Sequence, residues 1–147
     1  MGWVRTIACC LAAGVIQFLV GYLFHEAVPM IAPAIPRQYE NAALFRPLAD
    51  WTGTYMVLHP FGYGVVFALV YCGLRSWCTF PAGGGGGCIF GAGVFLVGSL
   101  PIFLIAHASF AASVEVIASW VLQSACQYVL AGAAVGIVAD PRWRRST

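Results

Sequence analysis

The sequence contains very little charge. Only 8% of its 147 residues are Asp, Glu, Lys or Arg, and all seven basic residues are arginine, whereas an ordinary soluble domain carries about 25%. So few charges cannot cover the surface of a folded chain in water, which excludes a water-soluble enzyme. An apolar share of 61% excludes an intrinsically disordered chain as well. The composition therefore indicates an integral membrane protein.

The chain also lacks the C-x-x-C arrangement of cysteines. None of its six cysteines belongs to a C-x-x-C motif, and five are predicted in the cytoplasmic half, where a reducing environment opposes disulfides. This placement disfavours a thiol oxidoreductase. It favours a packing role for these small, polarizable side chains.

Four long uncharged runs separate the few charges. A helix needs about 20 mostly apolar residues to cross a bilayer, and three of the runs fit one helix each. The other run is longer, but Pro81 and the glycines Gly83 to Gly87 break it into a loop and one helix. The sequence predicts an all-α fold, a four-helix transmembrane bundle that forms one integral membrane domain over residues 1–147. The predicted spans are 4–25, 51–74, 86–107 and 114–138, with an outer loop over 26–50.

The arginines predict the orientation of this bundle. With both termini in the cytoplasm, five arginines lie on the inner side and only Arg37 and Arg46 on the outer side, as the positive-inside rule requires. The inner five are Arg5, Arg75, Arg142, Arg144 and Arg145. We therefore expect a multi-pass protein of a bacterial inner (cytoplasmic) membrane with cytoplasmic N and C termini.

The outer loop contains four prolines and so cannot be one long helix. We expect its apolar first half to lie along the membrane interface and residues 38–45 to form a short helix.

The segment Phe45-Arg46-Pro47 before the second span resembles a segment of small bacterial four-helix membrane proteins, a resemblance that implies architecture and no activity. Small multidrug transporters place a glutamate in the middle of their first helix, where this chain has Gln17.

Glycines recur at helical spacing in the predicted spans. Lipid supplies no hydrophobic drive for helix association, so small residues that allow close van der Waals approach must supply the contact. We predict helix–helix contacts at these glycines. They are Gly14 and Gly21, then Gly83, Gly87, Gly91 and Gly98, and finally Gly132 and Gly136.

Polar residues inside the spans also recur about every four residues, which places them on single helix faces. We predict an interhelical polar network in the outer half of the bundle. Its members are Gln17, His59, Ser99, Ser119, Gln123 and Gln127. Pro60 and Pro101 lie in the same region and are predicted to kink their helices, because proline removes one backbone hydrogen bond.

The same region contains every histidine of the chain. Imidazole and carboxylate ligands suit Zn, Cu or Fe, so the sequence allows a metal site formed by His25, His107 and Glu115, with His59 or Glu26 as a further ligand. A haem would need two histidines at one depth on adjacent helices, and His59 with His107 is the pair that comes nearest to this requirement.

No motif in the sequence carries a catalytic signature, and no resident cofactor is indicated beyond this candidate metal or haem. The prediction is a small polytopic membrane protein, an accessory or structural subunit of a larger membrane complex or a self-associating bundle. Its expected partners are the lipid bilayer and other membrane subunits or further copies of the chain, and not nucleic acid. The alternatives are a metal-, haem- or proton-handling protein and, third, a small-solute permease that acts as an oligomer.

Overall fold

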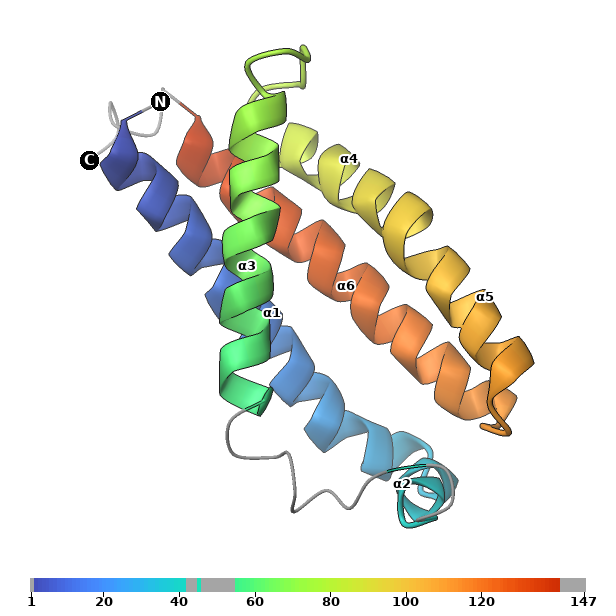
Figure 1. The fold of residues 1–147 in the computed structure, drawn as a ribbon. Helices are drawn as coiled ribbons and strands as arrows, with labels where there is room; N and C mark the ends of the chain where they lie inside the picture. Colours follow the sequence, from blue (N-terminus) through green and yellow to red (C-terminus); the bar gives the residue numbers. More distant parts are fainter. Residues whose placement is uncertain (1, 42–44, 46–54, 141–147) are drawn as a thin grey trace.

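The computed structural model describes residues 2–41, 45 and 55–140, and this part of the chain contains helices and no strands. The long helices α1 (Trp3–Ile31), α3 (Tyr55–Leu74) and α6 (Val114–Ala139) lie side by side with a segment made of α4 and α5 (Figure 1). The short helix α2 (Ala34–Tyr39) follows α1. The prediction of an all-α chain is confirmed for the described residues.

Three helical segments are long and apolar enough to cross a membrane: Trp3–Ile31, Gly84–Ser109 and Val114–Ala139. They match the predicted spans 4–25, 86–107 and 114–138. The apolar part of α3, Leu58–Leu74, is shorter. The start of the predicted span 51–74 lies outside the described residues, so a fourth crossing stays a prediction.

Helix α1 is longer than the span predicted within it. Helix α1 continues six residues beyond residue 25, through Pro29, before it ends at Ile31. The end of the predicted span was placed at Glu26 because this residue is charged. A charged residue does not by itself end a helix, which can continue beyond the apolar part of a bilayer. The short helix after it was also misplaced: α2 begins at Ala34, whereas residues 38–45 were predicted, and 42–44 lie outside the described part.

The third span bends through a π-helical turn. Helix α4 (Gly84–Val94) passes into the turn η2 (Phe95–Ser99) and then into α5 (Leu100–Ser109). Pro101 has no backbone N–H to donate into the preceding turn, and a π turn there shifts the hydrogen-bond register around it. The irregularity predicted at Pro101 therefore takes this form.

Helices α4 and α6 pack so closely at their glycines that their backbones are in contact. A Cβ on Gly132 would overlap the carbonyl oxygen of Gly87, and a Cβ on Gly87 would overlap that of Gly132. Gly91 and Gly136 meet the facing backbone in the same way. The predicted glycine contacts of this helix pair are thus confirmed, except at Gly98, where a Cβ would meet nothing.

A second glycine contact joins α1 to α3. A Cβ on Gly14 would lie 2.6 Å from Cδ1 of Phe61, and a Cβ on Gly64 would lie 2.7 Å from Cα of Gly14. The contact of Gly14 was predicted, but that of Gly64 was not. On the N-terminal side of this crossing, Cys9 and Ala13 are fully buried against Phe67 and Tyr71. Small residues on α1 therefore pack against large aromatic rings of the neighbouring helix.

Large apolar side chains cover the outside of the molecule. Ile31, Val97 and Trp77 are each more than four-fifths exposed, and every long helix has exposed leucine, isoleucine or valine. A soluble protein rarely exposes contiguous apolar surface of this kind. The pattern fits a chain whose outer surface is solvated by lipid.

The contact between α4 and α6 gives a stability prediction. Gly132→Ala should destabilise the fold by about 1–3 kcal/mol, the usual cost of overpacking, because the added methyl group meets backbone that cannot move alone. Gly62→Ala is the matched control, since its Cβ would meet nothing within 4 Å and alanine favours helix by up to about 1 kcal/mol. Thermal unfolding in detergent measures both, and equal melting temperatures would contradict the glycine contact.

Candidate functional site

A polar cluster lies where the helices meet, midway along their length. Three hydroxyl groups from three segments form its first part. Ser99 donates to the hydroxyl of Tyr128 at 2.7 Å, and the hydroxyl of Tyr63 is hydrogen-bonded to that of Tyr128 as well. Ser99 is buried, and the rings of Tyr63 and Tyr128 meet edge to face with centroids 5.3 Å apart.

The hydroxyl trio has one hydrogen more than it uses. Each hydroxyl supplies one hydrogen and can accept two hydrogen bonds, and the three groups share two bonds among themselves. One hydrogen therefore remains to donate to a group outside the trio. In a site away from water, such a donor needs an acceptor from the protein or from a bound molecule.

Three glutamine amides form the second part of the cluster. Nε2 of Gln127 donates to the backbone carbonyl of Gln17 at 2.9 Å and so joins α6 to α1. The side chain of Gln17 is only 5% exposed, and its own Nε2 has no hydrogen-bond partner in the described structure. Gly21, one turn further along α1, faces the amide nitrogens of Gln123 and Gln127.

The cluster lies near the middle of the helices that form it. Gln17 is midway along α1 because that helix extends to Ile31, and Gln127 is midway along α6. Ser99 is close to the middle of the segment Gly84–Ser109. The helices therefore bring these polar groups together near the middle of their length.

Not every predicted network residue belongs to this cluster. Ser119 donates to the carbonyl of Val116 in its own helix at 2.7 Å, and the exposed ring of His59 stacks on Tyr63 with centroids 6.2 Å apart. Tyr128, which holds the hydroxyl trio together, was not predicted. The available signal was its position next to Gln127, because a tyrosine in mid-span must find a partner for its hydroxyl.

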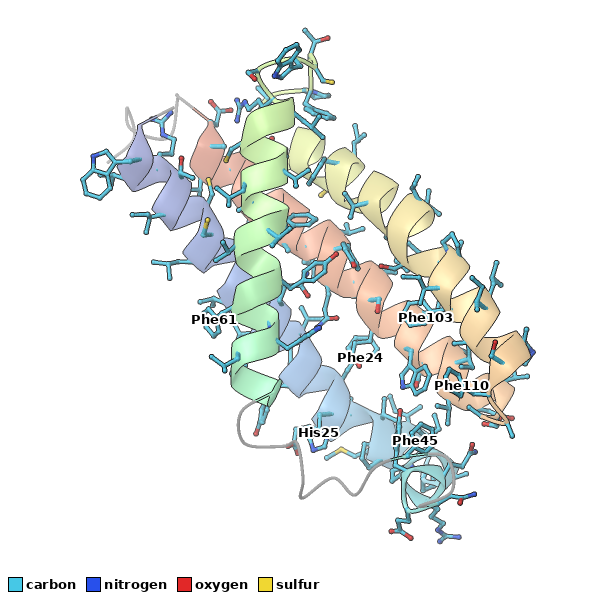
Figure 2. All side chains as sticks on the ribbon, viewed as in Figure 1. Phe24, His25, Phe45, Phe61, Phe103 and Phe110 are labelled. Carbon is cyan, nitrogen blue, oxygen red and sulfur yellow. The ribbon has the colours of Figure 1, made fainter. Side chains whose placement is uncertain are left out.

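The residues of the predicted metal site are exposed and do not form a ligand cluster. His25, His59, His107 and Glu115 all lie at the surface, with His25 on the half of α1 nearer α2 (Figure 2). Within the described residues, no three His, Cys, Asp or Glu side chains could hold a metal ion together. Glu115 lies in the first turn of α6, where a negative carboxylate interacts favourably with the helix dipole. The metal and haem sites stay predictions from the sequence, which elemental analysis of the purified protein would test.

An aromatic group at the α2 end of the molecule fixes α2 against α6. Nε1 of Trp120 donates to the hydroxyl of Tyr39 at 2.6 Å, and Phe45 packs on both rings. The backbone N–H of Ser113 donates to Oε1 of Gln38 at 3.3 Å. Burial raises the pKa of Tyr39, and the hydrogen bond from Trp120 lowers that pKa in part. The predicted pair of Arg46 and Asp50 lies outside the described residues.

No protein-family model, curated protein or solved structure matches this chain. The functional argument therefore rests on the residues and geometry above.

A double-mutant cycle tests the hydroxyl trio. Tyr63→Phe and Tyr128→Phe should each destabilise the fold, and the double variant should lose less than their sum, with a coupling of about 0.6 kcal/mol, the average for such bonds in membranes. The control cycle pairs Tyr128→Phe with Tyr22→Phe, because Tyr22 is exposed and should show no coupling. Additive losses in the first cycle, measured by unfolding in detergent, would contradict the hydrogen bond.

Proposed function

We propose that this chain is a four-helix integral membrane protein with a structural role, either as an accessory subunit of a membrane complex or through self-association. Three apolar candidate spans support membrane insertion. Helix α3 packs along α1 and would form the fourth crossing. In this arrangement the exposed apolar side chains contact lipid or a neighbouring subunit.

The arrangement of the helix ends supports an even number of crossings. The start of α1, the end of α6 and the connection between α3 and α4 lie at one end of the molecule, and α2 lies at the other (Figure 1). Arg5 and Arg75 belong to the first end, and Arg37 belongs to α2. The positive-inside rule then favours cytoplasmic termini in a bacterial inner membrane.

One observation carries the structural role: glycines that face outward on α4. Gly85 and Gly93 lie two turns apart with Ile89 between them, and a Cβ on either glycine would meet nothing within 4 Å. The inward glycines of the same helix already hold α6. An outward row of this kind lets a further helix approach the backbone closely, the condition for helix association in lipid.

Assembly in mild detergent tests the proposal. The protein extracted from its native membrane should run in a particle of greater protein mass than one 15.7 kDa chain, as measured by light scattering with the detergent subtracted. Gly93→Leu should convert the assembly to single chains. The leucine side chain would occupy the outward surface of α4 where a partner helix is expected, without contacting the rest of the same chain. Gly98→Leu is the matched control, since Gly98 is equally open but belongs to the π turn outside that row.

Two results would contradict this role. A monodisperse single chain in the wild-type protein would show that no stable partner exists. An assembly that survives Gly93→Leu would show that the outward glycines of α4 do not carry the contact.

A further inference from the structure

We infer that Cys9 of α1 and Cys72 of α3 form a dithiolate site for a single Cu(I) ion. The site lies between these two helices, toward the end of the molecule that contains the α3–α4 connection (Figure 1). It goes beyond the structural role proposed above and does not depend on it. The inference rests on the contact between the two thiols, on the number of ligands that this contact supplies and on two buried donors beside it.

The two thiols meet inside the interface between α1 and α3. Cys9 is fully buried in the core that these helices share with α6, and Cys72 packs against the same core from α3. Their side chains are close enough for the two thiols to interact directly. Because the pair joins two helices, no cysteine spacing in the sequence predicts it, and the packing role expected for these residues leaves their chemistry unused.

The number of ligands selects the metal. Thiolates are soft ligands that favour Cu(I), zinc and iron–sulfur clusters. Structural zinc sites and iron–sulfur clusters take four protein ligands, whereas no group of three His, Cys, Asp or Glu side chains could hold a metal ion in the described part of the chain. Cu(I) differs, because two thiolates on opposite sides complete a linear coordination. A pair of thiols therefore suits Cu(I) and neither of the other centres.

Two donors beside the thiols suit the charge of such a complex. Cu(I) displaces one proton from each thiol, so one positive ion with two thiolates carries a single net negative charge. The hydroxyl of Tyr71 and Nη1 of Arg75 are buried atoms without a hydrogen-bond partner in the described structure. Tyr71 directly precedes Cys72, and the backbone N–H of Arg75 donates to the carbonyl of Tyr71 at 2.9 Å. The helical turn that holds Cys72 therefore also carries both donors.

Positive charges act on both thiols. Arg75 acts on Cys72, and Arg5, one turn before Cys9 on α1, acts on Cys9. Burying an anion without a counter-charge costs several kcal/mol, and a guanidinium beside the sulfur atoms offsets that cost. A disulfide between the same cysteines would be neutral, and its sulfur atoms are weak acceptors. The charges and the unused donors therefore favour the anionic metal complex over a disulfide.

Little else in the structure uses these thiols. The thiol of Cys9 reaches the carbonyl oxygen of Val135 in α6 at 3.9 Å, a long contact even for sulfur, so its loss on metal binding costs little. In the orientation proposed above, this end of the helices faces the cytoplasm, where reducing conditions keep thiols free. The same conditions keep copper in the Cu(I) state that the site requires.

Competition for Cu(I) tests the site. The purified full chain, reduced under anaerobic conditions in detergent, is titrated with Cu(I) in the presence of the chromophoric chelator bicinchoninate. We expect the wild type to take one Cu(I) per chain from the chelator, with two sulfur ligands by X-ray absorption. Cys9→Ala and Cys72→Ala should each abolish this binding, because one thiolate cannot hold the ion against a chelator. Cys10→Ala is the matched control, since the Cys10 thiol lies on the carbonyl of Val65 at 3.9 Å, and it should bind like the wild type.

Removing the positive charge tests its part in the site. Arg75→Gln should weaken Cu(I) binding about 10- to 100-fold, the usual cost of losing a group that supports metal ligands. Arg37→Gln is the matched control, because Arg37 is exposed on α2 at the other end of the molecule. The affinity of the wild type should also rise with pH, since binding releases the thiol protons.

Several results would overturn the inference. One is a wild-type protein that takes no Cu(I) from the chelator or binds it through more than two sulfur atoms, a measurement that does not depend on how any variant folds. Others are Cys9→Ala or Cys72→Ala, eluting as folded protein, that bind like the wild type, and Cys10→Ala that loses binding to the same extent. A disulfide between Cys9 and Cys72 in protein isolated from cells without air would overturn it as well.

Discussion

The association of helices surrounded by lipid is the constraint on which this structure depends. In water, apolar side chains drive helices together, but acyl chains are as apolar as leucine and give no such drive. Helices in a bilayer must associate through close backbone approach and through polar groups that have no other partner. The protein uses both means: glycines bring α4 to α6 and α1 to α3, and hydroxyl and amide groups join the helices near their middle.

The glycine contacts and the polar contacts lie at different positions along the length of the helices. Toward the end that contains the α3–α4 connection, small residues and glycines let aromatic rings such as Phe67 and Phe90 fill the interior. Toward α2, helices α1 and α6 are separated by an apolar groove and joined again at the rim by Tyr39 and Trp120. The polar cluster lies between these regions. Within this cluster, the buried Nε2 of Gln17 has no hydrogen-bond partner in the described structure.

The sequence predicted the features that follow from periodicity and charge. The uncharged runs located three of the long helices, and the glycine spacing identified both faces of the α4–α6 contact because each glycine lies one turn from the next. The run of glycines after Pro81 was predicted to form a loop, but α4 begins within it, at Gly84. Its first member, Gly83, has φ of 72°, a backbone conformation that glycine adopts readily.

Other features depend on the relative rotation of helices, which no single segment determines. Spacing placed Gln17, Gln123 and Gln127 on common faces, and the structure brings them together at Gly21. The same reasoning could not show that His25, His59 and His107 lie on the surface. Gly64 and Tyr128 were missed because their roles come only from the residues opposite them, Gly14 and Ser99.

Cysteine accessibility in intact cells tests the transmembrane arrangement most directly. In a chain whose other cysteines are replaced by alanine, Cys78, exposed in the α3–α4 connection, should react with a membrane-impermeant maleimide only after the cells are permeabilised. In a cysteine-free chain, Glu40→Cys, at the exposed end of α2, should react without permeabilisation. Equal labelling of both positions in intact cells would contradict the account, because the two ends of the helices would then lie on the same side of the membrane.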